Sequence, residues 1–295
     1  MRVFLTGATG FIGRRLTAEL LGARHEVVGL ARSDTGAEWL RSAGATTYHG
    51  ELEDPDGLAR GATDVDAVIH AAYDHDFSRA RENAQKDGQV IEALGRVLGT
   101  SGRPLIVTSG TAMGNPAPGA PAIEDVCDRE NPNPRRMSEL TAERLLHRGV
   151  AVAVVRLPQV HDTTRFGLFS SMVALARATG VSAYVEDGLA RRPAAHVTDV
   201  ARLYRLALEH GEAGGRWHAV AEQGVRLRDV ATAIGARLKL PVMSLPAAQA
   251  AEHFGPLLPL ATLDVPASSA VTRKRLGWRP SGPDLLDDLS RMVLA

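Results

Sequence analysis

The chain has 295 residues, and its 34 basic side chains balance 34 acidic ones, so its formal net charge is zero. A neutral chain lacks the basic excess that nucleic-acid and anionic-membrane binders need, and a single cysteine cannot form an internal disulfide or a zinc cluster. No segment has the roughly 20 apolar residues of a membrane helix, and the N-terminus does not resemble a signal peptide. We therefore expect a globular, cytoplasmic protein that binds neither nucleic acid nor membrane.

The first half of the chain alternates short apolar strands with helical stretches. We expect strands over 3–5, 27–30, 45–48, 67–70, 105–107 and 151–155, with helices over 11–22, 36–43 and 79–99 between them. Strands that alternate with helices form βαβ units, which build a parallel sheet covered on both faces. Because the crossovers are right-handed, the pattern predicts an α/β fold of the doubly wound, Rossmann type.

Helices dominate from residue 161 onward. We expect them over 168–179, 198–210, 227–238 and 283–293, with short strands at 182–185 and 216–220 and one short helix within the irregular stretch 241–268. The pattern predicts a dinucleotide-binding domain in residues 1–160, completed by about 191–223, and a smaller mixed substrate-binding region in residues 161–190 and 224–295. A loop rich in Pro and Asn over 114–134 follows the fifth strand, at the sheet edge where such folds build their sites.

The strongest motif is a glycine loop, TGATGFIG, over residues 6–13 between the first strand and the first helix. Gly7 permits the tight turn, Gly10 lets the backbone approach a pyrophosphate, and Gly13 lets the helix pack closely on the sheet. The free N–H groups at the helix start then bind the phosphates. The alternative is a helix start with incidental glycines. The residues that we expect to contact the dinucleotide here are Gly7, Thr9, Gly10, Phe11, Ile12 and Gly13.

The end of the second strand indicates which nicotinamide cofactor binds. An NAD site places an acidic residue there for the ribose 2′-hydroxyl, but position 31 is alanine and Asp34 comes too late in the chain. Arg32 can hold a 2′-phosphate by charge-assisted hydrogen bonds, and Ser33 can add a hydroxyl donor. The sequence therefore favours NADP(H) over NAD(H), unless Arg32 is an ordinary solvated side chain at a strand end.

With these residues the chain resembles the extended short-chain dehydrogenase/reductases, together with the NAD-dependent epimerase/dehydratase proteins, over about residues 1–220. The resemblance also rests on Gly50-Glu51-Leu52, His70-Ala71-Ala72, Thr108-Ser109, the segment 156–160 and the segment 196–200. It implies a small-molecule substrate and a homodimer formed through helices near 79–99 and 136–148. It also implies cofactor contacts from Glu51, Leu52, Ala71, Ala72, Thr108 and Pro158.

The chain departs from this family at the proton relay. The family uses a tyrosine and a lysine four residues later, but here no tyrosine has a lysine at that distance. The family pattern places Arg135 in the tyrosine position and Glu139 in the lysine position, so the chain resembles an atypical short-chain dehydrogenase/reductase. Arg135 stays protonated and can bind a carbonyl oxygen or carboxylate, and Glu139 can accept hydrogen bonds from the ribose hydroxyls. An i,i+4 surface ion pair between the two is an equal alternative.

Other residues must then move the proton. Ser109, after the fifth strand, fits the family's hydroxyl that binds the substrate oxygen, with Thr111 as the fallback. Tyr73 and His161 follow the fourth and sixth strands and are our first candidates for the proton donor. Weaker candidates are His75, Tyr184 and His196.

No ligand spacing for a metal recurs, so we expect none. These residues predict an NADP(H)-dependent oxidoreductase that interconverts a carbonyl and an alcohol on a small organic substrate. The alternatives are an NAD(P)-dependent epimerase or dehydratase, and a non-catalytic NADP(H)-binding redox sensor.

Overall fold

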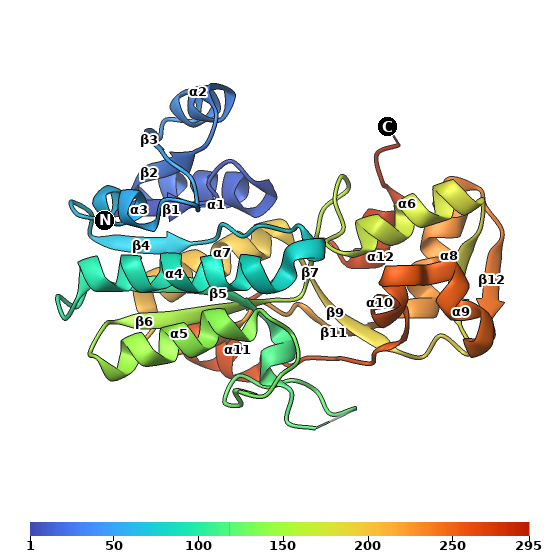
Figure 1. The fold of residues 1–295 in the computed structure, drawn as a ribbon. Helices are drawn as coiled ribbons and strands as arrows, with labels where there is room; N and C mark the ends of the chain where they lie inside the picture. Colours follow the sequence, from blue (N-terminus) through green and yellow to red (C-terminus); the bar gives the residue numbers. More distant parts are fainter. Residues whose placement is uncertain (118, 295) are drawn as a thin grey trace.

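The computed structural model describes residues 1–117 and 119–294, so Pro118 in the expected loop and Ala295 at the end of the expected substrate region lie outside it. Figure 1 shows a large lobe, in which helices cover both faces of a sheet, joined to a smaller lobe built from later parts of the chain. None of the helices in the described ranges is long and apolar enough to cross a membrane.

Seven parallel strands form the sheet of the large lobe, in the order β10-β6-β5-β4-β1-β2-β3. The chain runs outward in both directions from the β1–β4 pair, and such a reversal creates a crevice at the carboxyl ends of the strands. The Rossmann-type prediction is confirmed, because all six expected strands lie in this sheet. The strands are β1 (Arg2–Thr6), β2 (Glu26–Ala31), β3 (Thr46–His49), β4 (Ala67–His70), β5 (Leu105–Gly110), β6 (Val152–Leu157) and β10 (Arg216–His218).

Helices cover the two faces of this sheet in separate groups. On one face α1 (Phe11–Gly22) packs against α7 (Val197–His210), and on the other α4 (Ala80–Leu98) packs between α3 (Pro55–Gly61) and α5 (Arg136–His147). Each group closes its own apolar core against the sheet. The remaining elements are α2 (Asp34–Ser42) and the short 3₁₀ turns η1 (Phe77–Arg79) and η2 (Thr111–Gly114).

The smaller lobe has its own apolar core, which includes Phe169, Val230 and Leu289. Its strands form a three-stranded sheet, β11-β9-β7, and a parallel pair of β8 with β12. The strands are β7 (Gln159–His161), β8 (Ser182–Val185), β9 (Arg191–His196), β11 (Glu222–Arg226) and β12 (Val242–Leu245). The helices are α6 (Phe169–Thr179), α8 (Leu227–Leu238), α9 (Ala247–Phe254), η3 (Gly255–Leu257), α10 (Leu258–Thr262) and α12 (Leu285–Ser290).

Three expectations for the later chain need correction. The segment 191–220 returns to the large sheet only through β10, because β9 pairs with β7 and β11 instead. The stretch 241–268 forms the strand β12 and three short helices, α9, η3 and α10, rather than one short helix. After it, α11 (Ala270–Leu276) and Trp278 return to the large lobe: the Trp278 ring is fully buried in that core, and its Nε1–H donates to the Asp199 carbonyl at 3.0 Å.

Candidate active site

The glycine loop is shaped by two positions that no side chain could occupy. Gly7 has φ +70°, and a Cβ there would lie 2.8 Å from the backbone nitrogen of Ala72. A Cβ on Gly13 would lie 1.9 Å from the carbonyl oxygen of Gly7. A Cβ on Gly10 would meet only that carbonyl oxygen, at 3.2 Å. Because no side chain caps α1, its first N–H groups are available to phosphate oxygens, so the loop fits a dinucleotide.

The expected cofactor residues lie around this loop at the carboxyl edge of the sheet. Ala71 and Ala72 run directly against Gly7. The Thr108 hydroxyl is buried and already engaged, with the His70 carbonyl at 2.7 Å and the Tyr204 hydroxyl at 2.7 Å. Of the remaining expected cofactor residues, Glu51 is exposed after β3, whereas Thr9, Phe11, Ile12, Leu52 and Pro158 are half-buried.

The 2′-phosphate prediction rests on two neighbours at the start of α2, which the structure places differently. Arg32 is exposed. The Ser33 hydroxyl instead accepts a hydrogen bond from Gly36 N at 3.2 Å, as the N-cap of α2. This end of α2 lies against the glycine loop, because a Cβ on Gly36 would be 3.1 Å from the Thr9 methyl. The backbone of Arg32 therefore lies at the edge of the expected phosphate site.

Sequence reasoning missed a second cation beside this site. The Arg14 Nε donates to the Thr9 carbonyl at 3.0 Å, and its guanidinium carbon lies 4.5 Å from the centroid of the Trp39 ring. Arg14 thus bridges the glycine loop and α2. Its place directly after Gly13 in the motif was the available signal.

Arg135 and Tyr73 meet at the crevice. The guanidinium carbon of Arg135 lies 3.8 Å from the centroid of the Tyr73 ring, and its Nη2 donates to the Thr108 carbonyl at 2.6 Å. Burial raises the pKa of Tyr73, and the Arg135 charge opposes that rise without cancelling it. The structure therefore brings together two of the four predicted catalytic residues. Tyr73 precedes β5 in the chain, and Arg135 follows it.

A buried carboxylate that the sequence did not reveal lies behind Arg135. Asp87 on α4 accepts hydrogen bonds from His70 Nε2 at 3.1 Å and from Ser138 Oγ at 2.5 Å. Its Oδ1 lies 3.9 Å from Arg135 Nη1. Burial alone would raise the pKa of Asp87, but the Arg135 charge and the two hydrogen bonds hold it below its usual value. The carboxylate is therefore ionised beneath the crevice.

The expectation that Glu139 faces the ribose hydroxyls is corrected by its contacts. Both of its oxygens are taken up by Arg156, whose Nε and Nη2 donate at 2.8 and 2.6 Å. Burial alone would raise the pKa of Glu139, but the two bonds from Arg156 hold it below its usual value. The surface ion pair with Arg135 does not form either. Glu139, which occupies the lysine position of the family pattern, therefore forms a buried ion pair with Arg156.

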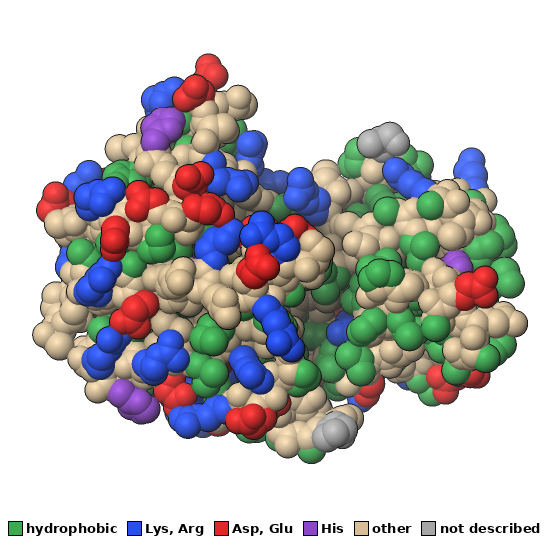
Figure 2. Space-filling model, viewed as in Figure 1, with side chains coloured by type: hydrophobic (Ala, Val, Ile, Leu, Met, Phe, Trp, Pro, Cys, Tyr) green, Lys and Arg blue, Asp and Glu red, His purple; other side chains and the backbone are tan. Residues whose placement is uncertain are grey.

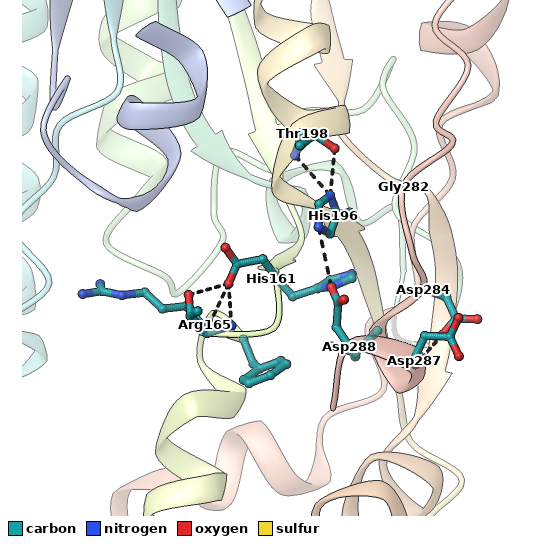
Figure 3. A network of polar contacts seen from close by, with 12 residues as sticks. His161, Arg165, His196, Thr198, Gly282, Asp284, Asp287 and Asp288 are labelled. Carbon is teal, nitrogen blue, oxygen red and sulfur yellow. Dashed lines mark hydrogen bonds and ion pairs between the residues drawn. The ribbon is translucent and has the colours of Figure 1, made fainter. Parts of the chain in front are cut away.

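His161 is also withdrawn from the crevice. Its side chain has no exposed surface, and its Nδ1 lies 2.7 Å from Asp288 Oδ2 on α12 (Figure 3). The same carboxylate oxygen lies 3.8 Å from His196 Nε2. The His161 Nε2 has no hydrogen-bond partner among the described residues, with Glu222 Oε2 at 3.7 Å. These contacts give His161 the role of joining β7 to α12 and do not favour it as a proton donor.

Ser109 lies near the carboxyl end of β5. It is 3% exposed, and its hydroxyl has no hydrogen-bond partner in the part of the chain that the structure describes. It lies beside Glu139 and helps to hold the pKa of that carboxyl down. Thr111 is buried one turn further on, and Tyr184 lies on β8 in the smaller lobe, away from this group. The Ser109 hydroxyl therefore faces the Glu139 carboxylate, and binding a substrate oxygen requires it to turn away from that group.

Arg192 on β9 is a further residue that sequence reasoning missed. Its Nη2 donates to the carbonyls of Pro259 and Leu260, at 2.5 and 3.2 Å, and its Nε is buried without a partner among the described residues. Its neighbour Arg191 instead pairs with Asp264 at 2.9 Å. Burial lowers the pKa of Arg192 to about 10. Because its hydrogen bonds go to neutral carbonyl oxygens, this half-buried guanidinium can accept an anion.

The comparison with known families agrees with this geometry. Residues 3–220 match the family described as "NAD dependent epimerase/dehydratase family". The chain belongs to this family. Its members bind a nicotinamide dinucleotide, and the uncapped start of α1 is suited to that ligand.

Individual relatives cover nearly the whole chain. The chain is 44% identical to uncharacterized protein C2A9.02 of Schizosaccharomyces pombe, over 98% of each chain. It is 26% identical to a 4-hydroxy-2-methyl-3-oxo-4-farnesyl-3,4-dihydroquinoline-1-oxide ketoreductase of Stigmatella aurantiaca, over 86% of this chain and 80% of the relative. Its fold matches dTDP-glucose 4,6-dehydratase of Streptomyces venezuelae with NAD and TYD bound, with a TM-score of 0.79 at 20% identity, over 99% and 95% of the two chains.

Proposed function

We propose that this protein is an NADP(H)-dependent oxidoreductase that interconverts a carbonyl and an alcohol on a small organic substrate. The observation that carries this proposal is the stack of Arg135 on Tyr73, at the sheet edge where the glycine loop opens. The likeness to a ketoreductase supports it. When bound, the nicotinamide supplies the hydride.

Three residues of the chain interact with the carbonyl oxygen of the substrate. Tyr73 donates its phenolic proton to the carbonyl oxygen, and the neighbouring Arg135 charge makes that proton easier to release. Arg135 itself stays protonated, so it stabilises developing negative charge and does not act as the acid. The Ser109 hydroxyl, near the carboxyl end of β5, donates a second hydrogen bond to the same oxygen when it turns away from Glu139.

The substrate side of the proposal concerns the hollow between the lobes, which Figure 2 shows in the space-filling view. Arg192 is a half-buried cation on β9, the strand that pairs with β7 and β11, and it has no carboxylate within ion-pair distance among the described residues. We propose that the substrate carries an anionic group that Arg192 binds. Replacing Arg192 with methionine should raise the KM of an anionic substrate far more than that of a neutral analogue.

The decisive test is steady consumption of NADPH with a panel of ketones and aldehydes. Tyr73→Phe should lower kcat by about 100-fold or more, because general acid catalysis contributes about that much. Tyr48→Phe is the matched control, since the Tyr48 hydroxyl serves only Gly57 O, at 2.7 Å. NADPH binding without turnover of any substrate, unchanged in Ser109→Ala, would instead identify a redox sensor.

An epimerase or dehydratase is the second candidate, and the family description and the dehydratase fold neighbour favour it. These reactions return the nicotinamide to its starting state. Conversion of a sugar nucleotide without net change in NADPH or NADP⁺ would support this candidate and contradict the reductase.

We also propose a homodimer in the cytoplasm. Helices α4 and α5, which the family resemblance implicates in dimerisation, lie side by side with a surface groove between them, lined in part by Gly88, Gln89, Met137 and Thr141.

A further inference from the structure

We propose that Asp87 is a positioning residue that holds the Arg135 guanidinium over the ring of Tyr73. This inference rests on the proposed function, in which Tyr73 is the proton donor. Asp87 does not face the crevice, since only 2% of its surface is exposed. It therefore acts through Arg135.

Two hydrogen bonds reach Asp87 from its neighbours. His70 Nε2 lies 3.1 Å from Asp87 Oδ1, and His70 Nδ1 lies 2.7 Å from Thr6 Oγ1, which also accepts from Ala72 N at 3.2 Å. Ser138 Oγ donates to Asp87 Oδ2 at 2.5 Å. A buried carboxylate also needs a permanent positive charge nearby, which arginine supplies because it stays protonated at any ordinary pH.

Arg135 is the countercharge. Its Nη1 lies 3.9 Å from Asp87 Oδ1, and no other ion pair to Asp87 is found among the described arginines and lysines. A buried carboxylate that loses a permanent countercharge is strongly destabilised. Asp87 therefore draws the guanidinium inward, against the sheet.

Three contacts fix the plane of the guanidinium. Asp87 attracts Nη1, the Thr108 carbonyl accepts from Nη2 at 2.6 Å, and the Tyr73 ring covers one face at 3.8 Å. A planar fork suits this combination, and a lysine ammonium cannot reproduce it. The Arg135 backbone is fixed too, because its N–H donates to Asn133 Oδ1 at 2.9 Å.

The same chain of contacts reaches the glycine loop. Thr6 precedes Gly7, and the backbone at Ala72 would be struck by any side chain on Gly7. Hydrogen bonds then run from Thr6 through His70 to Asp87. The phosphate-binding loop and the Arg135–Tyr73 stack are thus joined by one network of contacts, which places the donor relative to the loop.

The charges around Tyr73 make the inference testable, because the direction in which the pKa of Tyr73 changes depends on whether Arg135 stays in place. Burial raises the pKa of Tyr73, Arg135 lowers it, and Asp87 and Asp74 raise it more weakly. The ring of His75 also faces Tyr73, at 5.3 Å between centroids. If Asp87→Asn left Arg135 in place, the pKa of Tyr73 would fall, because one negative charge is gone. If Arg135 is released, the pKa rises, because the stronger opposing charge leaves.

The experiment follows the ionisation of position 73 alone. A fluorinated tyrosine incorporated there has a lower intrinsic pKa, so fluorine NMR can follow its ionisation below the pH at which the protein unfolds. We expect Asp87→Asn to raise this pKa toward the value in Arg135→Met. A fall below the wild-type value would overturn the proposal. An equal rise in Ser138→Ala would overturn it too, because that variant keeps the Asp87 charge.

A second variant covers the case in which Asp87→Asn does not fold. Arg135→Lys keeps the charge but loses the planar fork, so we expect it to titrate above wild type. Titration at the wild-type value would contradict the positioning role. None of these measurements needs turnover, so failure of the positioning role can be told apart from failure of the proposed function. Full activity in Tyr73→Phe would reject Tyr73 as proton donor and leave the measured position of Arg135 unchanged.

Discussion

Arg156 on β6 donates to both carboxylate oxygens of Glu139 on α5, at 2.8 and 2.6 Å, and at most 1% of either side chain is exposed. Arg156 Nη1 also lies 3.1 Å from His218 Nε2 on β10. The pair thus ties α5 to β6 and to the neighbouring edge strand β10, one helical turn from Arg135.

Breaking this pair should cost much more stability than removing both partners. We expect Glu139→Ala to lower the free energy of unfolding by about 3–5 kcal/mol, because it leaves the Arg156 charge buried and unpaired. The double variant Glu139→Leu/Arg156→Met should recover most of that loss. Chemical denaturation measures both. Glu143→Gln, which removes the Arg129 partner at the surface, is the control and should cost less than about 1 kcal/mol.

The choice of cofactor should depend on Arg32. We expect Arg32→Ala to weaken NADPH binding by roughly 10- to 100-fold, as for the loss of charge-assisted hydrogen bonds. NADH binding should change little, because it lacks the 2′-phosphate. Titration of each dinucleotide measures the two affinities. Arg41→Ala, at the far end of α2, is the exposed control, and equal losses for both dinucleotides in Arg32→Ala would refute the 2′-phosphate role.

His218 should make the protein less stable in acid. Its Nδ1 donates to the Ser268 carbonyl at 2.8 Å, and burial and then the Arg156 charge lower its pKa to about 3. In the unfolded chain the same group titrates near the ordinary 6.5. Between these values the unfolded state binds more protons, so the free energy of unfolding falls as the pH drops, by up to ~1.4 kcal/mol per pH unit.

Replacing His218 isolates its share of this pH dependence. Denaturation of wild type and His218→Gln from pH 7 to pH 4 should show the stability difference between them shrinking as the pH falls. His210→Gln is the control, since 63% of the His210 side chain is exposed. A difference that stays constant with pH would show that His218 is not held neutral.

The homodimer should depend on the groove between α4 and α5. Met137 lines it, and a Cβ on Gly88 of α4 would lie 3.1 Å from the Met137 Cγ. Met137→Glu places a charge in the groove, and we expect monomers by sedimentation equilibrium. Met243→Glu on β12, where the methionine is 45% exposed, should leave the dimer intact. If both variants remain dimers, the dimer interface is not in this groove.

The sequence by itself determined the large lobe and the cofactor loop. Apolar strands that end at Gly7, His70 and Ser109–Gly110 alternate with helices, and that local periodicity sets both the parallel sheet and the edge at which the site lies. The glycine spacing was decisive for the same reason: a positive φ at Gly7 and the clash at Gly13 are local backbone requirements.

The tertiary structure alone decided which side chains meet. Arg135 and Glu139 are one helical turn apart, about 5.4 Å along the axis, so the first reaches the crevice and Tyr73, while the second lies deeper against Arg156. His161 looked available after β6, but a carboxylate 127 residues later in the chain, Asp288, binds it. Asp87 gave no local signal either, because its role comes from a strand and two helices that close around it. Hydrophobic periodicity determines which face of a segment packs on its neighbours. The chemistry of a buried charge depends instead on which residue, far away in the sequence, the fold places beside it.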